Sequence, residues 1–322
     1  TTAHSNTALG GNALAANTTG ADNVAVGTSS LYANTTASFN TAVGRSALGA
    51  NTTASENVGV GYQAGDALTT GAANTYIGTY AGSAATTSAN NVGVGRSALN
   101  TNITGTNNTA VGKDALSTTT VSDNTGVGYL ALSVTSTGAS NTAVGSSAMA
   151  ANTTGSNNVA VGYAALDSNT TGATNVAIGK ALDANTTGGN NIGIGYAALN
   201  ANTTANDNIG IGRDALKANT TGVNNTAVGS YALDANTTGD ENVAIGYAAA
   251  GATTTGSQNV AIGDQAFLAN TTGGSNVAVG REALLTNTTA SNNVAVGYKA
   301  LELNTTGAEN VAIGWEANKG ST

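Results

Sequence analysis

The stretch NVAVGYAALDSNTTGAT, residues 158–174, contains a pattern that recurs through the whole chain. It opens with Asn, a β-branched residue, a small residue, an aliphatic residue and Gly, and continues with Ala-Leu and Asn-Thr-Thr-Gly. Numbering from the first Asn gives positions one to seventeen. Self-similarity at a short fixed period is typical of solenoids and related repeat folds.

The position-one Asn occurs 19 times, and 16 of its 18 spacings are 17 residues, the other two being 16. The pattern therefore predicts a single continuous repeat domain over residues 1–322. The position-one residues are Asn6, Asn23, Asn40, Asn57, Asn74, Asn91, Asn108, Asn124, Asn141, Asn158, Asn175, Asn191, Asn208, Asn225, Asn242, Asn259, Asn276, Asn293 and Asn310.

Positions two and four are β-branched or aliphatic, a period of two that indicates a strand rather than a helix. The unit is too short for a helical hairpin, and the chain has no Asn-Gly or Asp-Gly pair to favour antiparallel hairpins. We therefore predict an all-β fold, a parallel β-solenoid (β-roll) of 19 coils with one coil per 17-residue repeat. Positions one to five would form one strand, Ala-Leu at eight and nine a second, and Asn-Thr-Thr-Gly the return turn.

The composition excludes several classes of function. Only nine Lys and Arg residues and a net charge of −8 argue against nucleic-acid binding. No stretch approaches the roughly 20 apolar residues of a membrane span, so no membrane insertion is expected. With no Cys, one histidine (His4) and scattered carboxylates, we expect no enzyme activity, no cofactor and no metal site.

Position three is Ala or Gly in every unit except that of Tyr76, and it faces away from positions two and four. Either the small residues line a tight interior and the aliphatic residues pack on another chain, or the aliphatic residues are interior and the small face abuts a neighbour. Both alternatives predict that one broad face is buried in a homo-oligomer, either a trimer or an end-to-end filament. The ends carry no separate cap sequence, so the chain would be a fragment of a longer fibre or be covered by stacked subunits.

Two columns of Asn are expected to stack along the solenoid. The second, at position twelve, heads Asn-Thr-Thr in 12 units; ladder and turn chemistry explains it better than glycosylation, which stays an alternative. The position-one column predicts a structural ladder of side-chain amides, each bonding to the coils above and below. Representative members are Asn23, Asn40, Asn57, Asn158, Asn175, Asn242, Asn259, Asn276 and Asn293.

Position six concentrates aromatic and basic residues in one column. It predicts a stripe for assembly or glycan binding, because aromatic faces beside cations suit both subunit contacts and sugar rings. Cation–π contacts are expected among Lys180, Tyr196 and Arg213, and between Arg281 and Tyr298. The stripe comprises Arg45, Tyr62, Arg96, Tyr129, Tyr163, Tyr196, Arg213, Tyr247, Arg281, Tyr298 and Trp315, with Lys113 and Lys180 in the same column.

The run Asn-Val-Ala-Val-Gly-Tyr-x-Ala-Leu-x-x-Asn-Thr-Thr-Gly resembles the head repeats of trimeric autotransporter adhesins, and more so the repeats of bacterial and phage tail-fibre-domain proteins. The resemblance covers all 19 units, although adhesin head units are shorter, near 14 residues. It implies a left-handed β-roll, usually trimeric, that projects from a cell or virion. The function expected is an extracellular structural fibre or adhesive shaft at a cell surface or on a virion, with a surface glycan or matrix receptor as partner.

Two alternatives remain. Threonine columns at positions thirteen and fourteen could bind ice, although a strand would turn only one of them outward. A polysaccharide-degrading β-helix enzyme is less favoured, because such enzymes have longer coils and a local charged cluster that breaks the repeat.

Overall fold

The structure, a computed structural model, describes residues 3–320. The chain divides into two compact units, residues 1–164 and residues 165–322. Strands in the first unit are β1 (Thr7–Leu9), β2 (Val24–Val26), β3 (Thr41–Val43), β4 (Val58–Val60), β5 (Thr75–Ile77), β6 (Val92–Val94), β7 (Thr109–Val111), β8 (Thr125–Val127), β9 (Thr142–Val144) and β10 (Val159–Val161). Those in the second are β11 (Val176–Ile178), β12 (Ile192–Ile194), β13 (Ile209–Ile211), β14 (Thr226–Val228), β15 (Val243–Ile245), β16 (Val260–Ile262), β17 (Val277–Val279), β18 (Val294–Val296) and β19 (Val311–Ile313).

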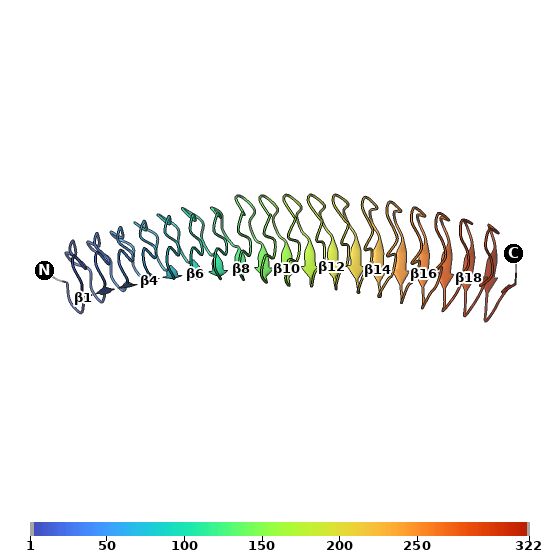
Figure 1. The fold of residues 1–322 in the computed structure, drawn as a ribbon, viewed down its shortest axis with the longest axis horizontal. Coiled ribbons are helices and arrows are strands. Elements are labelled where there is room, and N and C mark those ends of the chain that lie inside the picture. Colours follow the sequence, from blue (N-terminus) through green and yellow to red (C-terminus); the bar gives the residue numbers. More distant parts are fainter. Residues whose placement is uncertain (1–2, 321–322) are drawn as a thin grey trace. The chain divides into compact units, whose positions relative to one another are not determined.

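Each strand occupies positions two to four of its repeat, and within each unit consecutive strands pair in parallel (Figure 1). Equivalent positions face one another, as Ile209 faces Thr226 between β13 and β14. The register also holds across a 16-residue spacing, because Val176 of β11 pairs with Ile192 of β12. The missing residue therefore lies outside the strand. No helix occurs in residues 3–320, and the predicted all-β parallel solenoid is confirmed. Left-handedness stays a prediction.

The remainder of each coil is turn rather than the expected second strand. Ala47 and Leu48, at positions eight and nine, are both fully buried, whereas a strand would send neighbouring side chains to opposite faces. Ser46 and Leu48 have φ values of 56° and 50°, which bend the chain so that both side chains turn inward. Inter-coil bonding continues without strand geometry: Ser46 N–H donates to Thr28 O at 2.9 Å, and Leu48 N–H to Ala64 O at 2.9 Å.

The interior is lined by the small residues of position three, the Ala-Leu pair and both Asn columns. Ala42 of β3 has no exposed surface, whereas Thr41 is half-buried and Val43 is 37% exposed. The sequence left the orientation of the sheet open, and the structure places the small face inside. The aliphatic side chains of positions two and four therefore point outward.

Glycine at position five allows the coils to stack closely. Gly78, for example, has φ 132°, and a Cβ there would lie 2.6 Å from the carbonyl oxygen of Gly95 in the next coil. Both the backbone angle and this approach exclude a larger residue.

Candidate functional site

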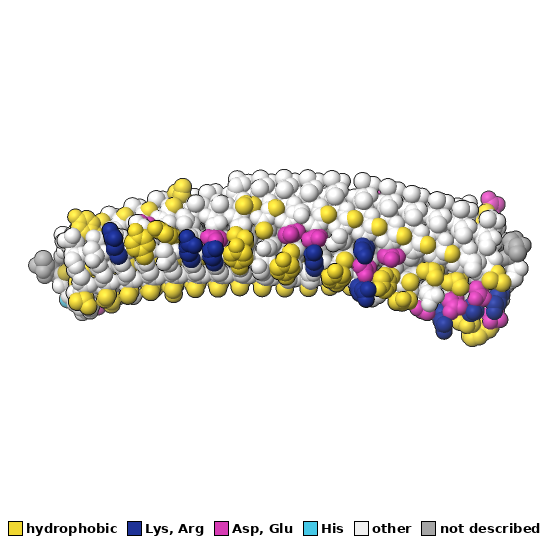
Figure 2. All heavy atoms as spheres, viewed as in Figure 1, with side chains coloured by type: hydrophobic (Ala, Val, Ile, Leu, Met, Phe, Trp, Pro, Cys, Tyr) yellow, Lys and Arg dark blue, Asp and Glu magenta, His cyan; other side chains and the backbone are white. Residues whose placement is uncertain are grey.

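The first candidate surface is the aliphatic face, formed by the side chains of positions two and four. Neighbouring coils cover part of each side chain and leave the rest in solvent. Figure 2 shows hydrophobic side chains in a row along one edge. Those exposed by more than a third include Val43, Ile77, Val92, Val111, Val144, Val159, Val161, Ile178, Ile245 and Ile262. Within each unit, an apolar strip of this kind marks an interaction surface or an aggregation hazard.

The position-one Asn side chains form a hydrogen-bonded ladder inside the coils. Asn40 N–H donates to Asn23 Oδ1 at 3.0 Å, and Asn57 N–H donates to Asn40 Oδ1 at 2.9 Å. The amide nitrogen bonds to the turn of its own coil, as when Asn242 Nδ2 donates to Gly256 O at 2.8 Å. The same pattern includes Asn158, Asn175, Asn259, Asn276 and Asn293.

The position-twelve Asn side chains form a second buried ladder. Asn34 Nδ2 donates to Asn17 Oδ1 at 3.0 Å and to Ala37 O at 3.1 Å. Asn34 and its counterparts from Asn51 to Asn304 have no exposed surface, although Asn17 is partly exposed. A glycan on a fully buried Asn would require the coil to open, so glycosylation does not fit the sequons from Asn34 to Asn304 in the folded chain.

The position-six stripe lies on the surface, where Figure 2 shows basic and hydrophobic side chains interspersed within each unit. Tyr163 and Trp315 are 70% and 75% exposed. Tyr62, Tyr129, Tyr196 and Tyr247 are also exposed, by 38% to 65%, and Arg45, Arg96 and Arg213 belong to the same column.

Cation–π contacts tie parts of the stripe together. Arg45 lies 5.9 Å from the ring centroid of Tyr62, and the predicted contact of Arg281 with Tyr298 is present at 6.0 Å. Arg213 lies over Tyr231, at position seven of the next coil, at 5.1 Å. Such contacts stabilise an exposed surface by about 0.5–1 kcal/mol each.

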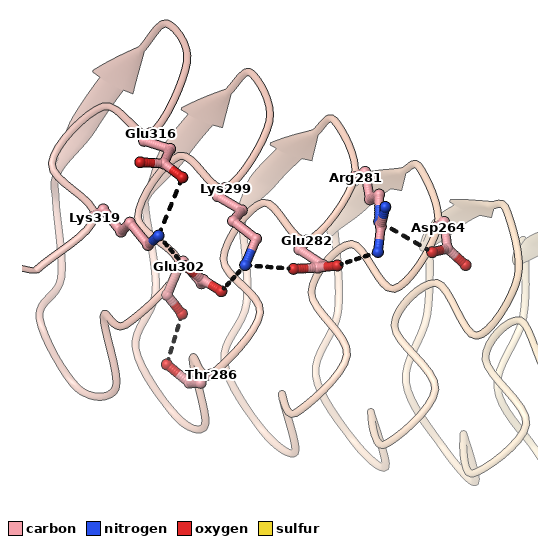
Figure 3. Close-up of polar contacts among 8 residues, drawn as sticks. All are labelled: Asp264, Arg281, Glu282, Thr286, Lys299, Glu302, Glu316 and Lys319. Carbon is pink, nitrogen blue, oxygen red and sulfur yellow. Dashed lines mark hydrogen bonds and ion pairs between the residues drawn. The ribbon is translucent and has the colours of Figure 1, made fainter.

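A chain of ion pairs links four consecutive coils of the second unit (Figure 3). Lys299 Nζ lies 3.0 Å from Glu282 Oε2 and 2.7 Å from Glu302 Oε1. Arg281 extends the chain from Glu282 to Asp264, and Lys319 extends it from Glu302 to Glu316. Arg281 belongs to the position-six stripe, whereas Glu282, Lys299, Glu302, Glu316 and Lys319 occupy positions seven and ten, which vary along the sequence; the repeat pattern therefore did not reveal these five.

Lys299 lies at the centre of this chain and has the strongest electrostatic effect in it. Its hydrogen bonds lower the pKa of the Glu282 and Glu302 carboxyls. Hydrogen bonds to Glu302 and then Glu282 in turn raise the pKa of Lys299. All three groups are therefore charged at neutral pH. A connected network of this kind holds neighbouring coils together better than isolated surface pairs do.

The arrangement of the two Thr columns argues against ice binding. The position-thirteen hydroxyls bond along the solenoid, as when Thr35 Oγ1 donates to Thr52 O at 3.1 Å. Thr36, at position fourteen, is exposed and Thr35 is half-buried. One column of hydroxyl donors is thus already used inside the protein.

His4 is exposed, and its ring nitrogen lies 3.3 Å from the hydroxyl of Ser5. Within the described part of the chain, no three His, Cys, Asp or Glu side chains gather as a metal site would require. Residues 3–320 also contain no helix that could cross a membrane.

A groove in the first unit was not found from the sequence. It has a volume of about 420 Å³ and lies over positions seven, ten and eleven of the coils that begin at Asn23, Asn40 and Asn57. These positions vary from coil to coil, so no repeat signal marks them.

No protein-family model matches the chain, and no curated protein matches its sequence.

Proposed function

We propose that the chain is a structural subunit of an extracellular fibre or adhesive shaft. It assembles with copies of itself through the aliphatic face and attaches to a surface by repeated weak contacts with a glycan or matrix receptor. Multivalency converts such contacts into useful avidity. The likeness of the repeat to adhesin heads and tail-fibre repeats supports the extracellular location, and no catalytic role is part of the proposal.

The observation that carries this proposal is the outward orientation of the aliphatic side chains. Ile178 and Ile245 are each 40% exposed, in a column where almost every coil repeats the same chemistry. A partner that covers such a face must present apolar rows with the same spacing between coils. A second copy of this chain meets that requirement at every coil. Side-by-side association, with a trimer as the expected form, therefore covers the face, whereas end-to-end stacking alone leaves it in solvent.

The test places charge in the aliphatic face. We expect light scattering to give the mass of a trimer for the unmodified chain, and a monomer for the double variant Ile245→Lys and Ile262→Lys. Lysine in a dry interface cannot keep its hydration, so association is lost. The control is Thr255→Lys and Thr272→Lys, which adds the same charge at exposed position-fourteen sites of the same two coils.

The control variant should keep the oligomer. A monomeric unmodified chain would overturn the proposed assembly, and so would an oligomer that both variants retain. Electron microscopy of the same samples distinguishes discrete particles from filaments. Long filaments that persist in the Ile245→Lys and Ile262→Lys variant would show that assembly uses the ends rather than the aliphatic face.

A further inference from the structure

The groove in the first unit is built from two short columns of side chains. Position seven contributes Ser29, Ser46 and Gln63, and position ten contributes Tyr32, Gly49 and Asp66. Its volume of about 420 Å³ falls in the lower part of the range for small-molecule sites. Three consecutive coils thus each supply one residue to each column.

Gly49 is the reason that the groove is open. A Cβ built there would have only backbone atoms of Ser46 and Ser29 as its nearest neighbours, at 3.3 Å and beyond. The side chains of Tyr32 and Asp66, one coil away on either side, therefore do not close over it.

Gly251 provides the contrast within the second unit, since it is also a glycine at position ten. A Cβ at Gly251 would meet Leu268 Cδ1 at 3.2 Å and Asp234 Oδ1 at 3.4 Å. The neighbouring side chains fill that notch. Glycine at position ten is thus insufficient for a groove; the side chains of the flanking coils must also stay clear of the glycine, as those of Tyr32 and Asp66 do beside Gly49.

The groove offers one aromatic face, one carboxylate and several neutral hydrogen-bonding groups. Tyr32 is 50% exposed. Gln63 Nε2 donates to Asp66 Oδ2 at 2.9 Å, which fixes the direction of the carboxylate. Asp66 is itself half-buried, and this burial raises the pKa of its carboxyl. Ser29 and Ser46 also line the groove.

This set of groups matches a polyhydroxylated ring. A sugar has an apolar face that stacks on an aromatic ring, and hydroxyls that donate to a carboxylate and exchange hydrogen bonds with amides and serines. None of the residues that line the groove is Lys or Arg, so phosphate, sulfate and acidic sugars have no counter-charge there. The chemistry selects a neutral ligand.

We propose that the groove over positions seven and ten of residues 29–66 binds a neutral saccharide, with Tyr32 as the stacking surface and Asp66 as the main hydrogen-bond acceptor. The inference rests on the proposed attachment role for its biological use, and supplies the class of ligand for it. The groove is separate from the aliphatic face. One site on each copy of an assembled chain would give the multivalency that weak saccharide binding needs.

The experiment titrates the purified chain with methyl glycosides of glucose, galactose and mannose, N-acetylglucosamine and their short oligomers, followed by calorimetry and by NMR of the sugar. We expect at least one to bind with a millimolar or tighter Kd. Tyr32→Ala and Asp66→Asn should each weaken that binding about tenfold or more, because each removes a principal contact. Gly49→Leu should abolish it by filling the groove.

Control variants lie in the second unit, at the two repeat positions, seven and ten, that form the groove columns in the first unit. Tyr231→Ala removes a position-seven tyrosine. Asp234→Asn removes a position-ten carboxyl whose pKa is also raised by burial. Neither should alter the affinity. Thermal unfolding of each variant separates lost binding from lost folding, and Tyr32→Ala carries the test if Gly49→Leu does not fold.

Two outcomes would overturn the inference: no saccharide in the panel binds, or binding is unchanged in both Tyr32→Ala and Asp66→Asn. The titration is repeated on the Ile245→Lys and Ile262→Lys variant. If that variant is monomeric and still binds sugar, saccharide binding by the groove is independent of assembly. Conversely, an oligomer that binds no sugar leaves the structural role intact and removes only the groove.

Discussion

Two coils of the same solenoid fill their interiors in different ways. In the coil that begins at Asn208, position three is Gly210, position nine is the buried Leu216 and position twelve is the buried Asn219. In the coil that begins at Asn74, position three is Tyr76, which has no exposed surface, and position nine is Gly82. The large side chain has moved from one wall of the interior to the other.

Space rather than backbone conformation explains the exchange. Gly82 has φ 58°, close to the 54° of Leu99 at the equivalent position, so leucine could adopt its backbone angle. A Cβ on Gly82, however, would lie 2.6 Å from Cζ of Tyr76. Gly65, at position nine of the preceding coil, leaves room for the same ring, because a Cβ there would lie 3.0 Å from Cδ2 of Tyr76.

The polar part of the interior changes together with the apolar part. The Tyr76 hydroxyl donates to Asn74 Oδ1 at 3.3 Å and lies 3.2 Å from Ser88 Oγ. Position twelve is Leu68 in the coil that begins at Asn57 and Ala85 in the coil that begins at Asn74, so the second Asn ladder is interrupted there. Asn51 Oδ1, the last acceptor before the interruption, is buried with no hydrogen-bond partner. The large residue at position three is therefore accommodated by accompanying changes at positions nine and twelve.

The largest effect is expected from Tyr76→Ala. Position nine is already glycine, Gly65 and Gly82, in this coil and the preceding one, so removal of the buried Tyr76 side chain leaves a cavity. We expect the cavity to destabilise this part of the first unit by about 3–5 kcal/mol. Native-state hydrogen exchange of the amides in β4, β5 and β6 measures the loss locally. The triple variant Tyr76→Ala, Gly65→Leu and Gly82→Leu restores the common residues at positions three and nine and should recover most of the stability. A triple variant no more stable than Tyr76→Ala would contradict this account of the packing.

The repeat alone was enough to predict the parallel solenoid, a strand within positions one to five, and the two Asn columns as candidate ladders; the structure limits the strand to positions two to four. The alternation of small and aliphatic residues could not decide which side of the strand is interior, because the same alternation is expected whether the small or the aliphatic residues face inward. The answer was present in one coil: Tyr76 at position three coincides with Gly82 at position nine. Two positions that exchange size must share one space, and this places position three inside.

Other features had no such signal. The second strand was wrong because adjacent Ala and Leu both point inward, which requires the positive φ values at positions seven and nine. The groove depends on the combination of Tyr32, Gly49 and Asp66 at position ten of three consecutive coils, and the repeat does not mark this combination. A periodic pattern describes what coils share, and a binding site formed by their differences becomes visible only when the three coils are stacked.

The next largest effect is on the pH dependence of stability. Burial raises the pKa of Tyr76 from 10.0 to about 12. The unfolded chain therefore loses this proton near pH 10, whereas the folded chain holds it to about pH 12. The stabilisation is complete below pH 10 and is lost as the pH rises from 10 to 12, by about 2–3 kcal/mol.

Urea unfolding of the unmodified chain and of Tyr76→Phe, each from pH 8 to pH 12, measures this dependence. Phenylalanine cannot ionise, and all other tyrosines are kept, so the difference between the two profiles isolates Tyr76. Tyr76→Phe should be slightly less stable at pH 8 and should lose less stability above pH 10. Parallel profiles would mean that the Tyr76 hydroxyl is open to water.

The smallest effect should be a gain in stability from repairing the ladder in the second unit. Asn236 Oδ1 is buried with no hydrogen-bond partner, and the next coil has Thr253 where most coils have Asn. Thr253→Asn supplies an amide that donates to Asn236, as Asn236 Nδ2 itself donates to Asn219 Oδ1 at 2.8 Å. It also offers an acceptor to Asn270 Nδ2, which now reaches Thr253 Oγ1 at 3.3 Å.

We expect Thr253→Asn to raise the free energy of unfolding by about 1 kcal/mol, the usual net value of a buried hydrogen bond. A double-mutant cycle with Asn236→Ala gives the control, because the gain should shrink when the acceptor is removed. A gain that persists in the Asn236→Ala background would come from something other than the ladder. A loss of stability from Thr253→Asn would show that the coils around Thr253 are adapted to threonine, as those around Gly65 and Gly82 are adapted to Tyr76.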